Sequence, residues 1–447
     1  MTTLPLVTHQ SLESIIAWQQ GRPITVKEFL ADVVHLSALL PDGKHMLNIC
    51  RDRYHFTVGL AAAIVSNKLS LLPPTHTLAM VQQLQAFSAD VFCLHDSENC
   101  ETPLPLVRYP AMPGHSHALL AIPQIDSQQS IAIVFTSGST SAPIPHPKTW
   151  GSLVRNVQAQ ASRLGLDENI DYTILGTVPP QHMYGFESTV LLALQSGNAL
   201  SSAHPFYPAD ILAALHALPH AWILASTPLH LRLLLESGMP MPAAALVLSA
   251  TAPLSVALAQ TVETRFKAPL LEIYGSTETG QIATRRTTQT AQWQLFPKVR
   301  LTESKGRIWA SDGHVETPIA LNDVIDLLTA SHFLLHGRTE DLINIAGKRS
   351  SLANLNHQLN GIDGVLDGAF YMPDEISHDH VTRLSACVVA PGHSAQSLLT
   401  ALRERIDPIF LPRPLIFVDG LPRNSTGKLP REALKQVVES QLAIMAL

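Results

Sequence analysis

Short apolar runs alternate with helical stretches along the first part of the chain. Met46–Cys50, Leu69–Leu72 and Val91–Leu94 are brief and β-favouring, as buried strands are. Between them, Thr57–Ser66 is Ala-rich and Thr77–Ala86 has its apolar residues at helical spacing. This alternation predicts βαβ units around a parallel sheet.

The flanking segments carry the same two patterns. The apolar residues of Ser11–Leu40 recur at helical spacing and predict helix, broken at Gly21-Arg22-Pro23. Ile131–Phe135 is a continuous apolar run and predicts a central strand. An amphipathic helix is expected from about Ser152 to Leu164.

Later in the chain, Leu246–Ser249 and Leu270–Ile273 are expected strands around a helix at Leu254–Phe266, and Phe333–His336 belongs to a short apolar hairpin. In the C-terminal part the residue pattern predicts a strand, a helix and a second strand, which together indicate a small α+β unit. Its expected elements are Val381–Val389, Ser394–Asp407 and Leu415–Val418.

Composition narrows the class of protein. A chain of 447 residues exceeds one ordinary core, so two domains are expected. A net charge of −6 without a basic block argues against nucleic acid as a partner. The apolar runs fall short of the about 20 residues that a membrane helix needs. The four cysteines form no CxxC pair, so we expect a cytoplasmic protein with reduced thiols and no integral membrane association.

A cluster of small hydroxyl residues follows the apolar run that ends at Phe135. It consists of Thr136, Ser137, Gly138, Ser139 and Thr140. The glycine lets the backbone turn with its N–H groups inward, and the hydroxyls add donors, which suits an anion such as phosphate. The same composition also occurs in ordinary surface loops, so the cluster alone leaves both readings open.

Three later segments complete a pattern: Tyr274–Gly280, Gly337–Arg349 and Pro422–Leu429. With the hydroxyl cluster, and in this order, they resemble the adenylate-forming (AMP-binding) superfamily of acyl-CoA and aryl-CoA ligases over nearly the whole chain. The resemblance implies an α/β fold with two domains. Residues 1–339 would form a large domain of parallel and mixed sheets, helices and a small barrel-like β part, and residues 340–447 a small, mobile α+β lid.

The resemblance also implies a nucleotide site for ATP. Thr136 to Thr140 and Thr277 would bind phosphate, and the turn containing Ala250 and Ala252 would pass along the adenine. Tyr274 would stack on the adenine, with Gly275 and Ser276 in the same loop. Glu278 would hold Mg²⁺, which fits the preference of this cation for oxygen ligands, although a solvated glutamate in a turn is the alternative.

In relatives an aspartate before the short hairpin takes the ribose hydroxyls, because two carboxylate oxygens meet two donors. Asp326 fits this role best and Asp323 second. Arg338 would reach the ribose and phosphate.

The lid would carry the residues of both half-reactions. Lys428, in a Gly-flanked loop, is the implied catalytic lysine, offsetting charge as a carboxylate attacks the α-phosphate. Gly347 and Arg349 match residues beside the pantetheine tunnel, so CoA or a phosphopantetheine arm is the implied thiol. Neither Lys348 nor Lys428 lies in a GxxxxGK[ST] pattern, which excludes a P-loop NTPase.

The segment Val178–Phe186 resembles the part of the family that lines the acid pocket, and His182 is its candidate side chain; a histidine satisfied by backbone is the alternative. Amino-acid-activating relatives place an aspartate near the start of this segment, but no carboxylate occurs between Gln181 and Phe186, and Glu187 is the only one close by in the sequence. A buried substrate ammonium without a partner would be costly, so an amino acid is disfavoured. The segments Asn48–Tyr54 and Lys148–Trp150 most resemble stand-alone ligases of aryl-polyene and pigment pathways. An aromatic acid is therefore expected, with a fatty acid as the alternative, and an acyl carrier protein is a possible partner.

One segment departs from the family. Ser141 stands where a glycine is usual and Ile144 where a lysine is usual, and Lys148 is the candidate to supply the missing charge. The same departure motivates a second hypothesis, a nucleotide-binding regulator that has kept the fold and lost catalysis.

Overall fold

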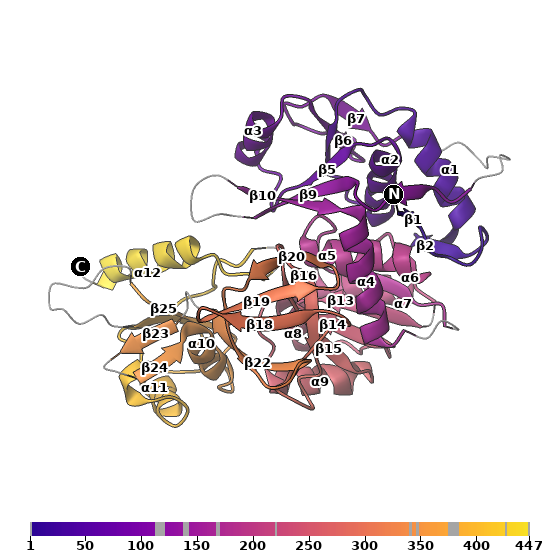
Figure 1. Ribbon diagram of the computed structural model, residues 1–447. Coiled ribbons are helices and arrows are strands. Elements are labelled where there is room, and N and C mark those ends of the chain that lie inside the picture. The colour runs from indigo at the N-terminus through magenta and orange to yellow at the C-terminus, as the bar shows by residue number, and fades with distance from the viewer. Residues whose placement is uncertain are drawn as a thin grey trace.

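The computed structural model describes residues 2–111, 121–136, 143–166, 170–219, 221–338, 342–345, 348–373, 384–424 and 427–445. The N-terminal part holds two large sheets with helices between and around them, and the C-terminal part lies to one side (Figure 1). The α/β class expected from the sequence is confirmed.

The first large sheet has six strands in the order β10-β9-β5-β4-β6-β7. All neighbours are parallel except β10, which runs antiparallel to β9 at the edge. The strands are β4 (His45–Asn48), β5 (Leu69–Leu72), β6 (Val91–His95), β7 (Leu106–Arg108), β9 (Ser130–Thr136) and β10 (Ile144–Thr149). Pro145 and Pro147 are tolerated in β10 because an edge strand has a side that needs no ladder hydrogen bonds.

The second sheet has eleven strands in the order β21-β22-β17-β16-β15-β14-β13-β11-β12-β2-β3. Its parallel part runs from β15 to β2, and the strands at both ends are antiparallel. The strands are β2 (Ile15–Gln19), β3 (Arg22–Thr25), β11 (Thr173–Gly176), β12 (Ala199–Ser201), β13 (Trp222–Ser226), β14 (Leu246–Ser249), β15 (Leu270–Ser276), β16 (Gly280–Arg285), β17 (Trp293–Leu295), β21 (Asp323–Leu327) and β22 (His332–Arg338).

Smaller sheets complete the N-terminal part. β1 (Thr3–Pro5) pairs with β8 (Gln124–Asp126). A three-stranded sheet of β18 (Arg300–Ser304), β19 (Arg307–Asp312) and β20 (Val315–Ala320) shares a core with β16, β17, β21 and β22. This unit corresponds to the barrel-like part expected from the sequence.

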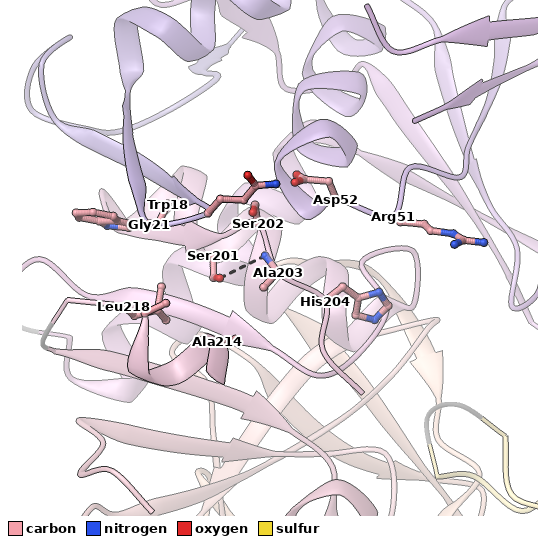
Figure 2. Close-up of a pocket in the computed structure, with 12 residues that line it drawn as sticks. Trp18, Gly21, Arg51, Asp52, Ser201, Ser202, Ala203, His204, Ala214 and Leu218 are labelled. Carbon is pink, nitrogen blue, oxygen red and sulfur yellow. Dashed lines mark hydrogen bonds between the residues drawn. The ribbon is translucent and has the colours of Figure 1, made fainter. Parts of the chain in front are cut away.

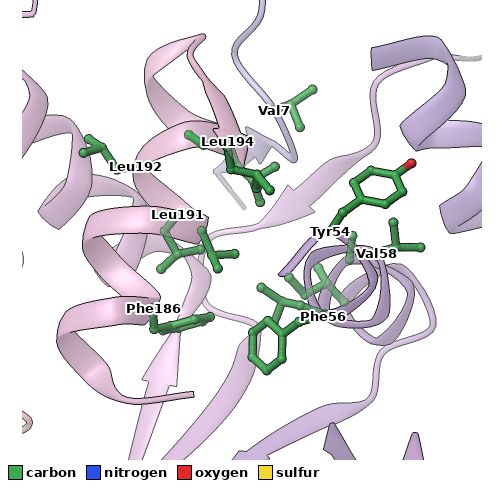
Figure 3. Packing of buried hydrophobic residues seen from close by; sticks show 14 of the residues in the cluster. Val7, Tyr54, Phe56, Val58, Phe186, Leu191, Leu192 and Leu194 are labelled. Atoms are coloured by element: carbon green, nitrogen blue, oxygen red, sulfur yellow. The ribbon is translucent and has the colours of Figure 1, made fainter. Parts of the chain in front are cut away.

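Helices lie between the two large sheets and on their outer faces. The N-terminal helices are α1 (Val26–Ser37), α2 (Arg53–Val65), α3 (Leu78–Phe87), α4 (Trp150–Leu164), α5 (Met183–Gly185), the π-helical turn η1 (Phe186–Leu191), α6 (Leu192–Ser196), α7 (Pro208–His216), α8 (Pro228–Glu236) and α9 (Val256–Phe266). α2 contacts β4 and β5 of one sheet and β12 of the other. Phe56 of α2 and Phe186 of η1 belong to one fully buried cluster (Figure 3), so burial of apolar surface joins the two sheets.

The helix expected from Ser11 is wrong over its first half. Residues Ile15–Thr25 form the β2–β3 hairpin, and helix begins only at Val26, where the Thr25 hydroxyl caps the Glu28 amide. The reason is the turn. Gln20 and Gly21 both have positive φ, at 51° and 79°, which is the geometry of a tight two-residue hairpin.

The C-terminal part has its own strands and helices. They are β23 (Leu342–Ile345), β24 (Lys348–Ser351), α10 (Leu352–Asn360), β25 (Asp367–Tyr371), β26 (Ser385–Val389), α11 (Ala395–Arg403), the short 3₁₀ turn η3 (Pro408–Phe410), β27 (Leu415–Phe417) and α12 (Arg431–Met445). β25, β26 and β27 form one sheet, and two hydrophobic clusters in this part contain only residues from Ile343 onward. The boundary predicted at residues 339 and 340 lies outside the described residues and stays a prediction.

α11 ends earlier than the sequence pattern suggests, at Arg403 instead of Asp407. The Asp407 side chain accepts a hydrogen bond from the Ile409 amide and so begins η3. Among the described residues, no helix combines the length and the apolar character that crossing a bilayer would require.

Candidate active site

The hairpin of β9 and β10 brings one edge of the site into place. Thr136, the last residue of β9, hydrogen-bonds through its hydroxyl to Nε2 of His146 at 3.0 Å. Ser137, Gly138, Ser139 and Thr140, predicted to cradle the phosphates, lie outside the described residues, as does Ser141.

A tight turn between β15 and β16 faces this hairpin. The Ser276 and Thr279 hydroxyls lie 3.1 Å apart, and each accepts a hydrogen bond from the other residue's amide at 3.2 Å. Gly275 is required here, because a Cβ at this position would lie 2.2 Å from the Gly280 carbonyl oxygen. The turn therefore presents Thr277 and Glu278 on a rigid backbone.

Glu278 carries its carboxylate toward the β9–β10 hairpin. Its Oε1 lies 3.8 Å from Nε2 of His146, and its side chain is 44% exposed. Burial raises the pKa of this carboxyl, but hydrogen bonds from its own amide and from Ser276, with the nearby charges of His146 and Lys148, outweigh that effect and lower it. Glu278 is therefore ionised at neutral pH and open to a cation.

Lys148 is buried beneath the same turn. Its ammonium group donates to the carbonyl oxygens of Thr277 and Glu278, the latter at 3.2 Å. Burial lowers its pKa, and the charges of Glu187 and Glu278 oppose that shift. The structure thus places Lys148 on backbone carbonyls of the turn.

Tyr274, just before the turn, lies in an aromatic cluster with Trp293 and Phe333 at centroid distances of 5.6 and 5.7 Å. Its hydroxyl donates to the Asp323 carboxylate at 2.8 Å. Asp323 is thus beside Tyr274, whereas Asp326, the first choice for the ribose contact, pairs with His336 at 2.7 Å.

A bulge separates the two aspartates. Asp323 pairs with Arg338 in the β21–β22 ladder, and the register shifts between Val324 and Ile325. Because such a shift changes which face of the strand a side chain occupies, the two aspartates could not be distinguished by spacing.

The turn containing Ala250 and Ala252 follows β14 directly, beside β15. The Leu254 amide donates to Glu272 of β15 at 3.3 Å, which ties the end of the turn to the strand that leads to Tyr274. Thr251, between the two alanines, has φ of 78°, a conformation that is strained for a β-branched residue and that often marks functional sites.

His182 caps the short helix α5. Its Nδ1 accepts a hydrogen bond from the Tyr184 amide at 3.3 Å. Burial, reinforced by the positive charge of Lys428, lowers the pKa of His182 to about 4. The ring is neutral at pH 7, and we infer from the Nδ1 contact that the proton sits on Nε2, which can donate to an acidic ligand.

Arg53 supports this segment and was not recognised as a candidate from the sequence. It is fully buried at the start of α2, and its guanidinium donates to the carbonyls of Gly176 and Val178 at 2.9 and 3.0 Å. It therefore fixes the end of β11 and Val178, which lies four residues before His182 along the chain. The only available signal was its place in the Asn48–Tyr54 run.

Lys428 belongs to a braced loop of the C-terminal part. Its amide donates to the Asn424 side chain at 2.9 Å. Arg423 forms a bidentate pair with Asp367, both N···O distances being 2.7 Å, and also donates to the Gly427 carbonyl at 3.0 Å. The spacing of the motif gave no indication of Asp367.

This loop docks on the N-terminal part. A Cβ on Gly427 would lie 3.1 Å from the Leu229 Cβ and 3.7 Å from the Thr227 hydroxyl, both at the start of α8. Nearby, Arg232 of α8 donates to the Leu366 carbonyl. Together with the influence of Lys428 on His182, these contacts bring the predicted catalytic lysine to the predicted acid pocket.

Of the predicted pantetheine residues, the structure describes only Arg349, which lies on β24. Arg349 pairs with Asn344 of β23, and Gly347 lies outside the described residues.

A cavity of about 680 Å³ opens at the other end of the eleven-stranded sheet (Figure 2). Among its lining residues are Trp18, Arg51, Asp52, Ser201, Ala203 and His204. None of the predicted site residues that the structure describes lines it, so it is separate from the candidate site.

Two large sheets with a small α+β part docked on the start of α8 are the architecture of an adenylate-forming ligase. Enzymes of this class use ATP to activate a carboxylic acid as an acyl-adenylate and then pass it to a thiol. Comparisons with known proteins agree.

Residues 41–319 match the family of AMP-binding enzymes, and the chain belongs to that family. The 4-coumarate–CoA ligase of Rhodobacter capsulatus is 28% identical over 306 residues, which are 68% of this chain and 75% of that protein.

Solved structures share the fold. The o-succinylbenzoate CoA synthetase of Bacillus subtilis, in complex with its acyl-adenylate intermediate, has a TM-score of 0.82 at 17% identity, covering 97% of this chain and 99% of that one. A double mutant of the same enzyme bound with its product analogue OSB-NCoA has a TM-score of only 0.65 at the same identity and coverage.

Proposed function

We propose that this ligase activates a small aromatic carboxylic acid as acyl-AMP, with Lys428 as the catalytic lysine and His182 in the acid pocket. The observation that carries the proposal is the docked loop, which brings Lys428 within electrostatic range of His182 although the two residues lie far apart in sequence. Such closure gathers the charged groups where the reaction needs them.

In the nucleotide site, Tyr274 and the turn of Ala250 and Ala252 hold the adenine. Asp323 takes the ribose hydroxyls in preference to Asp326, since it lies beside Tyr274 while Asp326 pairs with His336. Arg338, its ladder partner, reaches the ribose and phosphate. Thr277 and the segment Thr136 to Thr140 bind the phosphates through hydroxyls and amides.

Glu278 holds Mg²⁺. The fit rests on an ionised, half-exposed carboxylate at the turn that also carries Thr277. Within the described residues, no group of three or more His, Cys, Asp or Glu side chains could hold a metal ion. An ion on Glu278 would take its other ligands from oxygens of the nucleotide and water, the usual arrangement for Mg²⁺. When bound, the ion offsets the negative charge of the triphosphate.

The chemistry then follows from charge. A carboxylate oxygen of the acid attacks the α-phosphorus of ATP, the bond to the β-phosphate oxygen breaks, and pyrophosphate leaves. Lys428 stabilises the negative charge that develops on the phosphate oxygens, and neutral His182 donates from Nε2 toward the acid. In the second step a thiolate attacks the acyl carbon and AMP leaves, with Gly347 and Arg349 beside the pantetheine.

An aromatic acid is favoured over the alternatives. Relatives of this chain act on 4-coumarate and on indoleacetate, by their names. Glu187, the carboxylate next to the His182 segment in the sequence, is buried and faces Lys148 and Gln281, so it is not available to a substrate ammonium. A fatty acid is the remaining alternative.

The test is pyrophosphate release from ATP and Mg²⁺ with a panel of hydroxycinnamic, benzoic, indolic, fatty and amino acids. Rates highest with aromatic acids support the proposal, and rates highest with fatty or amino acids overturn the substrate class. Parallel reactions with CoA and with a phosphopantetheinylated carrier protein then identify the thiol, because only the true acceptor yields thioester at the rate of adenylation.

A further inference from the structure

A buried cation and a buried carboxylate lie beneath the turn that carries Thr277 and Glu278. Lys148 is 8% exposed and comes from the edge strand β10. Its ammonium donates to the Thr277 and Glu278 carbonyls, and these contacts span 129 and 130 residues of sequence. A single side chain thus holds two successive peptide groups of the turn.

Glu187 lies under the same turn, from the π-helical η1. It is 1% exposed, and its Oε1 has no hydrogen-bond partner among the described residues. A Cβ on Gly280, which closes the turn with φ of 69°, would lie 2.8 Å from that oxygen. The carboxylate is therefore in contact with the backbone that follows Glu278.

Lys148 and Glu187 compensate each other electrostatically. Burial raises the pKa of Glu187, and the charge of Lys148 is the main influence against that rise. Burial likewise lowers the pKa of Lys148, and Glu187 is the main influence against it. Removing the Lys148 charge would raise the pKa of Glu187 further, so the two side chains form one buried, linked pair.

Ile144 occupies a different place on the same strand. It is 47% exposed and pairs with Thr136, at the mouth of the hydroxyl loop. Lys148 points to the same face of β10 but lies four residues away, a separation of about 13 Å. If the Lys148 side chain turned to reach a phosphate, the Thr277 and Glu278 carbonyls would lose their donor.

We propose that Lys148 and Glu187 are positioning residues that fix the backbone of Thr277 and Glu278. In this role Lys148 does not replace the phosphate contact missing at Ile144. The inference depends on the proposed function only for the identity of the ligand that the turn binds. The contacts between Lys148 and the turn are present in the nucleotide-free protein.

The direct test is hydrogen exchange of the 274–281 peptide in nucleotide-free Lys148→Met. Loss of one charge-assisted hydrogen bond predicts exchange faster by about 10-fold or more, while Lys148→Arg, which keeps the donors, stays closer to the wild type. In pyrophosphate release, kcat of Lys148→Met falls by about 10- to 100-fold. Adding Ile144→Lys to Lys148→Met does not restore it.

Lys68 offers a matched control. Its ammonium donates to the Pro41 and Gly43 carbonyls at 2.6 and 2.9 Å, in the segment that precedes β4. Lys68→Met should leave both the exchange of the 274–281 peptide and kcat at the wild-type values.

Two outcomes overturn the proposal. One is wild-type exchange of the 274–281 peptide in Lys148→Met, and the other is recovery of its activity by Ile144→Lys with a change confined to KM for ATP. If Lys148→Met does not fold, the Glu187→Gln variant is measured instead. Faster exchange of the 274–281 peptide would then support the proposed positioning role, and wild-type exchange with wild-type kcat would refute it. A wild-type protein that forms no acyl-AMP would refute the proposed function, yet leave the exchange result standing.

Discussion

Replacing Arg423 by lysine is expected to slow adenylate formation without weakening ATP binding. Arg423 holds the Lys428 loop in place through its bidentate ion pair with Asp367 and its hydrogen bond to the Gly427 carbonyl. A lysine keeps the charge but cannot reproduce the bidentate geometry. The loop would then lose at least one charge-assisted hydrogen bond.

The size of the effect follows from burial. The two side chains are only 22% and 18% exposed, so solvent screens the pair weakly. A hydrogen bond to a charged group contributes about 1.5–3 kcal/mol, which corresponds to a fall in kcat of about 10- to 100-fold if the loop must be ordered in the transition state. KM for ATP should change little, since the contact matters most during the reaction.

The assay is pyrophosphate release under saturating ATP, with thioester formation from presynthesised acyl-AMP as the second readout, which should be unaffected. Arg286→Lys is the matched control, because Arg286 forms a bidentate pair with Glu263 at 2.8 and 3.0 Å outside the candidate site. If Arg423→Lys has the same kcat as the Arg286→Lys control, the proposed role of Arg423 in ordering the Lys428 loop is refuted.

Four further results are expected. Lys428→Ala should lower the adenylation rate by about 100- to 1,000-fold while calorimetric ATP binding stays near the wild-type value, and an unchanged rate would remove Lys428 from the mechanism. Arg349→Ala should slow thioester formation from acyl-AMP and leave pyrophosphate release intact; equal losses in both reactions would show that Arg349 does not act specifically in the thioester step. Asp323→Ala should raise KM for ATP by about 10-fold and Asp326→Ala by less than about twofold, and the reverse order would restore Asp326 as the ribose residue. Besides His182, burial lowers the pKa of His9, His230 and His314 to about 4. Because the unfolded chain takes up these protons below about pH 6.5 and the folded chain does not, stability should fall by up to about 2 kcal/mol per histidine between about pH 6.5 and 5, and a melting temperature that rises on acidification would contradict this.

Helices and strands were predicted correctly where the pattern of apolar residues fits only one kind of secondary structure. The apolar runs at Leu69–Leu72 and Leu246–Ser249 are strands with the expected bounds. The segment Ile15–Gln19 was wrongly predicted as helix, because its apolar residues fit a helix and a strand equally well. The turn at Gln20-Gly21 makes it the first strand of a hairpin.

The site could be predicted only as far as local motifs reach. Tyr274 and Glu278 are in one motif, so their proximity followed from the sequence. The partners that hold the site are distant in the chain, since Asp367 lies 56 residues before Arg423 and Thr277 lies 129 residues after Lys148. Such contacts depend on how the sheets pack, which spacing along the chain does not encode.

Intact-mass detection of acyl-AMP tests the central claim most directly. The wild-type protein is incubated with ATP, Mg²⁺ and a mixture of aromatic and fatty acids, without a thiol, and a Lys428→Ala protein is treated in the same way. The account predicts an aryl-AMP mass with the wild type, with stoichiometric pyrophosphate, and a strongly reduced signal with the variant. Bound ATP without any acyl-AMP or pyrophosphate would contradict the account and favour a nucleotide-binding regulator of the same fold.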